Sequence, residues 1–347
     1  MIREALGLLA AGNSLTMEEA AQAMEDIMTG EATPAQFGAF VTALRMKGET
    51  VEEIAGLARV MREKATRVDI SEPTVDTCGT GGDAHGTFNI STTAAFVVAG
   101  AGVKVAKHGN RAMTSKCGSA DVLEALGVKV DLGPDGVQYC LDKAGIGFMF
   151  APVFHPAMKY AVGPRREIGI RTVFNILGPL TNPAGAQAQV IGVTDDSIAA
   201  RMAEALRMLG CRHGLVTHGE EGMDEISVCG ESTVWEVAAD GITSYRITPE
   251  EYGLPRAALD DIKGGTAGDN AEIVRNVLKG EKGPRRDIVL LNAAAGLVAA
   301  DACGNLTDGL KLAAEIIDSG AAIHKLKEFI EVSQGFGKDQ VTGRDSG

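Results

Sequence analysis

Residues 75–100 read VDTCGTGGDAHGTFNISTTAAFVVAG, so a β-type run, a glycine-rich turn and an apolar helical run follow one another. Strand, turn and helix in this order form the repeating unit of α/β folds. Further β-type runs lie at 103–106, 147–150, 189–193, 213–217, 234–238 and 244–247. Helices are predicted at 92–100, 120–126, 136–144, 198–209, 269–279, 292–300, 308–319 and 321–332. The alternation predicts a large α/β domain over residues 71–347, with a mainly parallel central sheet flanked by helices.

The N-terminal residues contain only helical patterns. Thr16, Thr33 and Thr50 each stand three residues before Glu or Gln, which is the spacing of a capping box at a helix start. Helices are therefore predicted at 2–11, 17–29, 34–47 and 51–66, and together they predict a small all-helical domain over residues 1–70. A proline-containing segment follows much later, at 155–185. It is either a plain connection or, around 160–185, a crossover that returns to the helical domain.

Composition narrows the class of protein. The chain has 347 residues, of which 45% are apolar, and a net charge of −13. Such a charge disfavours binding to nucleic acid and to anionic membranes. The longest apolar stretch, near 93–103, is too short to span a bilayer. The six cysteines form no CxxC pair and the N-terminus carries no signal-peptide pattern, so we expect a cytoplasmic protein with reduced cysteines.

The glycine-rich turn is the first candidate site. Gly79, Gly82 and Asp83 lie between the strand and the residues 89–92 that open the helix. Clustered glycines let backbone N–H groups approach an anion, and a helix N-terminus adds donors and a positive partial charge. The turn matches neither the Walker loop nor the GxGxxG pattern. It predicts a phosphate cradle, and the alternative is an ordinary tight turn between a strand and a helix.

Two charged segments are further candidates. Lys104, Lys107, Arg111 and Lys116 make residues 104–116 the most basic stretch of this half of an acidic chain, which predicts a small polyanionic ligand. The alternative is a solvated basic loop. The adjacent carboxylates in 223–227 follow a predicted strand. They suit Mg²⁺, which takes few ligands from the protein and binds the phosphates of a substrate as well. A solvated acidic turn is the alternative there.

Several segments together resemble one family. GTGGD, TFNIST, KHGNR, SKCGSADVLEALG, HPAMK, RREIGIRTVFNILGPLTNPAG and MDEIS occur in the order found in the anthranilate phosphoribosyltransferases, and the resemblance covers nearly the whole chain. It implies transfer of the phosphoribosyl group from phosphoribosyl pyrophosphate to the amine of anthranilate, giving N-(5-phosphoribosyl)anthranilate and pyrophosphate in tryptophan biosynthesis. It also implies Mg²⁺, an active site between a helical and an α/β domain, and a homodimer formed through the helical domains.

The same resemblance implies which residues bind. Those expected to bind substrate are Gly79, Gly82, Asp83, Thr87, Asn89, Ile90, Ser91, Thr92, Lys107, His108, Gly109, Asn110, Arg111, Ser115, Ser119, His155 and Arg165. Asn110, His155 and Arg165 would face anthranilate, with Gly79 nearby. The residues expected to contact phosphoribosyl pyrophosphate are Gly79, Gly82, Asp83, Asn89, Ser91, Thr92, Lys107, Ser115 and Ser119. Ser91, Asp224 and Glu225 would hold Mg²⁺. No catalytic residue is certain, although His108 is a possible proton acceptor.

Other functions and roles stay open. Pyrimidine nucleoside phosphorylases share the architecture but carry a different glycine loop, and a non-catalytic relative of this fold could bind nucleic acid. Arg165 could instead form an ion pair with Glu167 or be a solvated charge, and Arg166 is the nearest rival for its role. The dimer expectation also rests on apolar positions of helices 2–11 and 34–47, which are more than one core needs: Leu6, Leu9, Phe37, Phe40 and Leu44.

Overall fold

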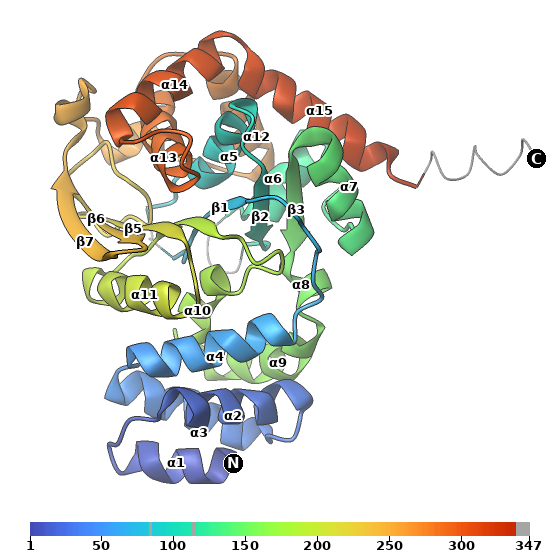
Figure 1. Cartoon of the computed structure of the whole chain (residues 1–347), viewed down its shortest axis with the longest axis vertical. Helices are drawn as coiled ribbons and strands as arrows, with labels where there is room; N and C mark the ends of the chain where they lie inside the picture. The colour runs from blue at the N-terminus through green and yellow to red at the C-terminus, as the bar shows by residue number, and fades with distance from the viewer. Residues whose placement is uncertain (83–84, 113–115, 338–347) are drawn as a thin grey trace, which may run out of the picture.

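The computed structural model describes residues 1–82, 85–112 and 116–337. Seven strands form one sheet in the order β3-β2-β1-β4-β5-β6-β7 (Figure 1). The strands are β1 Val75–Gly79, β2 Val105–Gly109, β3 Ile146–Phe150, β4 Ala188–Gly192, β5 His213–Gly219, β6 Ser232–Ala238 and β7 Gly241–Ile247. β1 to β5 pair in parallel, and β6 and β7 add an antiparallel edge. The predicted fold class, a mainly parallel sheet flanked by helices, is confirmed.

The strand order reverses between β1 and β4. From β1 the chain moves outward to β2 and β3, and it then returns to place β4 on the other side of β1. β1 and β4 pair in register from Val75 and Ala188 to Gly79 and Gly192. In open α/β sheets, ligands bind outside the carboxyl ends of the strands at such a reversal.

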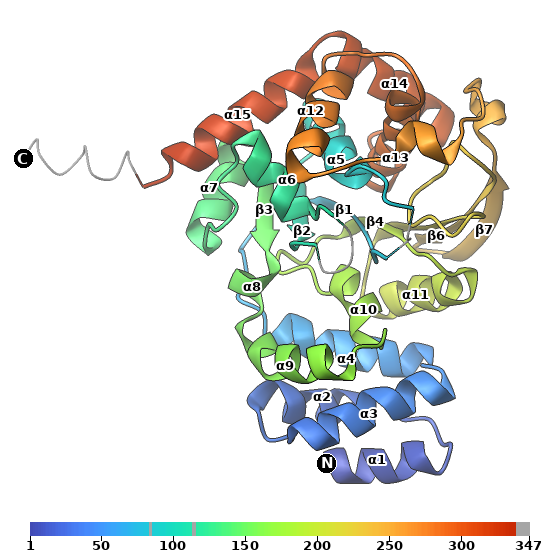
Figure 2. The same cartoon turned by 180° about the vertical axis from the view of Figure 1, so that it is seen from behind.

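One face of the sheet is covered by a thick layer of helices, at the top of Figure 1 and again in Figure 2. They are α5 Ile90–Gly100, α6 Ser119–Leu126, α7 Pro134–Ala144, α12 Ala267–Leu278, α13 Pro284–Ala299, α14 Leu306–Asp318 and α15 Ala321–Gly335. α5 and α13 are apolar on nearly every side because they lie inside this layer. The rings of Phe96 and Phe329 meet there with centroids 6.4 Å apart.

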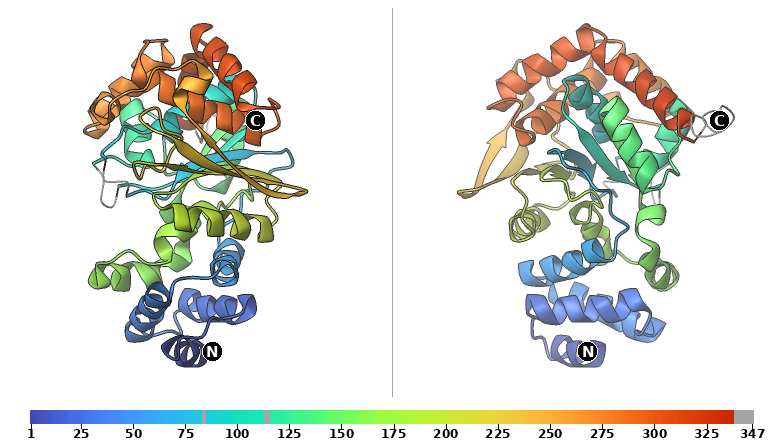
Figure 3. Two further views of the ribbon diagram at one scale, coloured as in Figure 1. Left: turned by 90° about the vertical axis from the view of Figure 1, so that its left-hand side faces the viewer. Right: turned by 45° about the vertical axis from the view of Figure 1, so that its right-hand side comes forward.

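The opposite face carries α11 Asp196–Met208 and the short α10 Phe174–Leu177, with the N-terminal helices beyond them (Figure 3). These are α1 Ile2–Ala10, α2 Met17–Thr29, α3 Pro34–Lys47 and α4 Val51–Glu63. The segment 155–185 contributes α9 Lys159–Ile168, which packs against α2 and α3. The remaining short helices are α8 Ala151–Phe154 and the 3₁₀ turns Pro156–Met158, Gly178–Leu180, Pro249–Tyr252 and Leu259–Ile262. No helix in the described ranges is both long and apolar enough to cross a membrane.

The three predicted capping boxes all form. Thr16, Thr33 and Thr50 each accept a hydrogen bond from the backbone N–H three residues on, at the starts of α2, α3 and α4. Glu53 of the third box is fully buried, yet its carboxylate accepts the N–H of Leu15 at 2.8 Å and pairs with Lys47 at 2.9 Å. A buried carboxylate is tolerated when it is paired in this way.

One hydrophobic core joins the N-terminal helices to the lower face of the sheet. It contains side chains of α1 to α4, of α9 to α11, and of strands β4 to β6. Leu9, Phe37, Phe40 and Leu44, which were expected to face a partner, are buried in this core, so that expectation is wrong. The reason is the distant segment α9–α10, which covers α3 and places the ring of Phe174 5.3 Å from that of Phe37.

Candidate active site

The loop after β5 folds back over the carboxyl ends of β1 and β4. A Cβ atom at Gly79 would overlap the carboxylate of Asp224, and one at Gly192 would overlap its backbone carbonyl. Both strand ends must therefore be glycine for the loop to lie this close. Gly192 was not predicted as a site residue, because its role depends on pairing with Gly79, which only the strand order reveals.

Asp224 and Glu225 meet the predicted phosphate cradle. Oδ2 of Asp224 accepts the backbone N–H of Gly81 at 2.7 Å, and Oε1 of Glu225 accepts that of Ser91 at 3.1 Å. Ser91 lies in the first turn of α5, where free N–H groups favour an anion. Asp224 is only 9% exposed, so a solvated acidic turn is excluded. The structure thus brings the glycine loop, the helix start and both carboxylates together at the strand-order reversal.

The glycine loop has a neighbour that was not predicted. Gly81 and Gly82 have φ angles of +71° and +81°, a region that favours glycine. Nη1 of Arg171 donates to the carbonyl oxygen of Gly81 at 3.1 Å. Asp83, the next predicted residue of this loop, lies outside the described residues, as does Ser115.

At the start of α5, the side chains are engaged in hydrogen bonds and packing within the protein. Nδ2 of Asn89 donates to the carbonyl of Cys117 at 3.2 Å, and Oδ1 accepts from Nδ2 of Asn270 at 2.9 Å. The side chains of Ile90 and Thr92 are almost fully buried. Thr87 forms a β-bridge with Lys263. Because these two side chains are buried, only the backbone groups of Ile90 and Thr92 are expected to contact a ligand.

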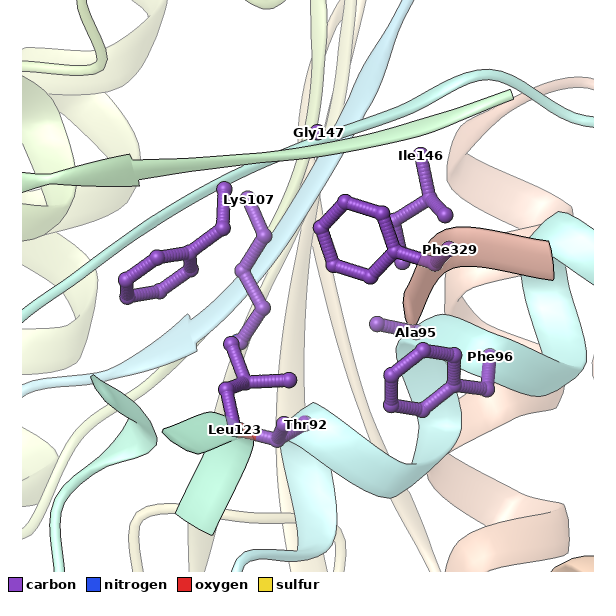
Figure 4. Close-up of a pocket in the computed structure, with 9 residues that line it drawn as sticks. Thr92, Ala95, Phe96, Lys107, Leu123, Ile146, Gly147 and Phe329 are labelled. Carbon is purple, nitrogen blue, oxygen red and sulfur yellow. The ribbon is translucent and has the colours of Figure 1, made fainter. Parts of the chain in front are cut away.

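Strand β2 ends three residues later than predicted, so Lys107 and His108 are strand residues and not loop residues. Pairing with β3, where Lys107 lies opposite Phe148, outweighs the polar character of this stretch. Lys107 is only 3% exposed, and its ammonium donates to the carbonyl oxygen of Thr77 in β1. Its stem lines a small pocket with Thr92 and the rings of Phe96 and Phe329 (Figure 4). The apolar lining shows that this pocket belongs to the core.

The predicted basic patch does not form. Lys104 lies just before β2, at the opposite end of the strand, and pairs with Glu72 at 2.8 Å. The guanidinium of Arg111 pairs with Asp121 at 3.0 Å and with Glu124, both of α6. The charge of Arg111 is therefore already compensated by two carboxylates from a helix that follows it in sequence.

Gly109, Asn110 and Ser119 lie at the end of β2. Oγ of Ser119 donates to the carbonyl oxygen of Asn110 at 3.2 Å. A Cβ at Gly109 would overlap that hydroxyl, so the glycine lets α6 begin close to the strand end. These three predicted residues are brought together beside the cradle.

His108 and His155 form a buried pair whose ring centroids are 5.0 Å apart. Burial lowers the pKa of His108 to about 3 and that of His155 to about 4. Both rings are therefore neutral near pH 7. Within the described part of the chain, Nε2 of each ring is buried without a hydrogen-bond partner.

Arg165 lies in α9, half-buried, with its guanidinium 5.4 Å from the centroid of the Phe174 ring. Burial lowers its pKa, although a guanidinium stays charged at neutral pH. Among the residues that the structure describes, no carboxylate forms an ion pair with Arg165, so the alternative of a Glu167 pair is not realised.

Comparison with known proteins places the chain in a family. The a/b domain of the glycosyl transferase family matches residues 71–323, and its helical bundle domain matches residues 3–65. The anthranilate phosphoribosyltransferases of Dehalococcoides mccartyi and Moorella thermoacetica are each 58% identical to it, over 96% and 95% of this chain and 98% of theirs.

Solved structures agree with this placement. The anthranilate phosphoribosyltransferase of Thermus thermophilus superposes with a TM-score of 0.91 at 48% identity, over 95% of this chain and 99% of that one. The Saccharomyces cerevisiae enzyme in complex with PRPP and Mg gives 0.89 at 28% identity, over 96% and 98%. This chain belongs to the anthranilate phosphoribosyltransferases.

Proposed function

We propose that the chain transfers the phosphoribosyl group of phosphoribosyl pyrophosphate to the amine of anthranilate, giving N-(5-phosphoribosyl)anthranilate and pyrophosphate in tryptophan biosynthesis. The observation that carries this proposal is the meeting of the glycine loop, the start of α5 and the Asp224–Glu225 pair outside the ends of β1 and β4. The identity of the two substrates is inferred from the family to which the chain belongs.

The acidic pair fits Mg²⁺. Asp224 and Glu225, with the hydroxyl of Ser91, would hold the ion, and the Saccharomyces cerevisiae relative was solved in complex with PRPP and Mg. Within residues 1–82, 85–112 and 116–337, no group of three or more His, Cys, Asp and Glu side chains could hold a metal. Two carboxylates suit a cation that takes its other ligands from substrate phosphates. When bound, Mg²⁺ neutralises charge that develops on the departing pyrophosphate.

The glycine loop and the start of α5 supply donors for phosphate oxygens. The N–H groups of Gly81 and Ser91 now donate to the two carboxylates, so these donors already point at oxygen anions. Phosphoribosyl pyrophosphate would replace the carboxylate oxygens there with its own. Gly79, Gly82, Asp83 and Thr87 lie in or near the glycine loop in sequence, and Lys107 and Ser119 come from β2 and from the start of α6. These residues are proposed to complete its binding site.

The reaction needs little acid–base help. The bond from ribose C1 to the pyrophosphate oxygen breaks with oxocarbenium character, as in glycoside cleavage, and the amine nitrogen of anthranilate bonds to C1. The aromatic amine is unprotonated at neutral pH, so its lone pair is available. The nitrogen then loses a proton, for which the neutral ring of His108 is a possible acceptor. Asn110, His155 and Arg165 are proposed to hold anthranilate.

Anthranilate fluorescence should disappear only when phosphoribosyl pyrophosphate and a divalent metal are both present. Omission of phosphoribosyl pyrophosphate should stop the decay because the co-substrate is then missing. Removal of the metal with EDTA should also stop it, because charge on the departing pyrophosphate then stays uncompensated. The same preparation should not phosphorolyse thymidine or uridine. Phosphorolysis of either nucleoside without loss of anthranilate would assign the chain to the pyrimidine nucleoside phosphorylases.

We also propose a homodimer through the N-terminal helices. Since Leu9, Phe37, Phe40 and Leu44 are buried in the core, we expect the contact to use residues that α1 and α3 leave accessible. These include the half-buried Leu6 and Leu8, the small residues Gly7, Ala10, Ala35 and Ala39, and the 83%-exposed Met46. Small residues let two helices approach closely.

Ala39→Arg should therefore give a monomer in sedimentation velocity, because a bulky charged side chain would prevent the close approach of the two helices. The monomer should remain folded, since an exposed arginine lowers the stability of the fold little. Ala239→Arg, in the exposed turn between β6 and β7, is the matched control and should remain dimeric. A dimer that persists in Ala39→Arg would place the interface elsewhere.

A further inference from the structure

Arg171 lies between α9 and α10, in the segment that leaves the N-terminal helices and approaches the sheet. The turn around it is held in place, because the N–H of Thr172 donates to Oδ1 of Asn175 at 2.9 Å. The Arg171 side chain is exposed, and it reaches from this turn to the glycine loop after β1, 90 residues earlier in the chain.

The guanidinium of Arg171 contacts the glycine loop directly. Nη1 of Arg171 donates to the carbonyl oxygen of Gly81 at 3.1 Å. A Cβ at Gly82 would overlap the same nitrogen, so the contact itself requires glycine there. On its other side, the N–H of Gly81 is held by the carboxylate of Asp224 at 2.7 Å. The two peptide groups around Gly81 are thus fixed by one cation and one anion from different parts of the chain.

The direction of one carbonyl also fixes the next N–H. In a trans peptide the carbonyl of Gly81 and the N–H of Gly82 point in opposite directions, and no cis peptide occurs in the described residues. Because the carbonyl is turned toward Arg171, the Gly82 N–H is turned away from it. Without this hydrogen bond the peptide could rotate, since both residues are glycines, and could present its carbonyl to an incoming phosphate.

The positive charge of Arg171 is not compensated by a described carboxylate. In the described ranges no carboxylate lies within ion-pair distance of it, whereas Arg59, Arg111 and Arg256 are each paired with glutamate. A cation without a carboxylate partner, on a chain of net charge −13, is favourable where an anionic ligand binds.

We propose that Arg171 is a positioning residue for phosphoribosyl pyrophosphate: it holds the Gly81 carbonyl so that the glycine loop presents N–H groups to the substrate's phosphates. The inference rests on the proposed function and adds a residue to its phosphate site. It assigns Arg171 to the phosphoribosyl pyrophosphate side of the site, in contrast to Arg165, which lies six positions earlier and is proposed to bind anthranilate.

The test compares Arg171→Ala, Arg171→Lys and the neighbouring Arg166→Ala, whose exposed side chain serves as the matched control. Arg171→Ala should raise the KM for phosphoribosyl pyrophosphate about tenfold or more, the size expected for a lost hydrogen bond to a charged group. The KM for anthranilate and the Tm should stay within error of the unmodified enzyme. Lysine should recover part of the loss, and guanidinium added to Arg171→Ala should recover part of it as well.

A direct binding measurement separates this inference from the proposed function. Calorimetric affinity for phosphoribosyl pyrophosphate with Mg²⁺, in the absence of anthranilate, should fall in Arg171→Ala by the same factor as the KM rises. An unmodified enzyme that consumes no anthranilate would refute the proposed function. An active enzyme in which Arg171→Ala leaves both values unchanged, or raises both KM values alike with a lower Tm, would overturn the role of Arg171 alone.

Discussion

Replacing Asp224 by Asn and Glu225 by Gln in one variant should lower kcat/KM by about 100-fold or more. The two carboxylates are the proposed metal ligands, and a metal that compensates charge on the leaving pyrophosphate is worth several kcal/mol. Amides are preferable to alanine because Asp224 is nearly buried and its oxygen holds the N–H of Gly81. An amide oxygen can still accept that bond, so the change removes charge while it keeps the local geometry.

Glu220→Gln is the matched control, because this carboxylate lies in the same loop but is exposed. It should leave kcat/KM and the Mg²⁺ dependence unchanged. The double variant should keep its Tm and need far more Mg²⁺ for half-maximal activity. If it retained the Mg²⁺ dependence and the rate of the unmodified enzyme, the metal would have to lie elsewhere.

Arg165→Ala should raise the KM for anthranilate by roughly 10- to 100-fold. A guanidinium meets a carboxylate with two parallel hydrogen bonds, and loss of such a pair costs about 1.5–3 kcal/mol. The structure leaves Arg165 available for this role, since its guanidinium lies over the Phe174 ring and no ion pair engages it within the described residues. The ring also restrains the guanidinium, so the side chain loses less conformational entropy when anthranilate binds.

Steady-state kinetics with each substrate varied in turn provide the measurement for Arg165. The KM for phosphoribosyl pyrophosphate should change little, Arg165→Lys should recover only part of the loss because ammonium cannot form the fork, and Arg166→Ala should behave like the unmodified enzyme. A selective effect of Arg165→Ala on phosphoribosyl pyrophosphate would require the two substrate sites to be reassigned.

Local signals predicted much of the fold. The capping boxes at Thr16, Thr33 and Thr50 mark the starts of three helices correctly, because a cap depends only on residues three positions apart. The alternation of strands and helices likewise predicted the parallel sheet. The glycine loop and the acidic pair were found separately, and the structure shows that they touch.

Features that depend on distant neighbours were missed. Lys107 and His108 belong to β2 because β3 pairs with them, and Arg111 is neutralised by carboxylates of α6. Gly192 and Arg171 gain their importance from Gly79 and Gly81, which lie about 100 residues away in sequence. Spacing along the chain carries no information about such contacts.

The core that joins the N-terminal helices to the sheet has a consequence for synthesis on the ribosome. The ring of Phe37 packs against that of Phe174, and α9 packs against α2 and α3. These helices are made first, but the residues that close their apolar face emerge much later. Part of the apolar surface of the nascent N-terminal helices therefore stays uncovered until residues 159–177 have left the exit tunnel, and exposed apolar surface of this kind favours aggregation and chaperone binding.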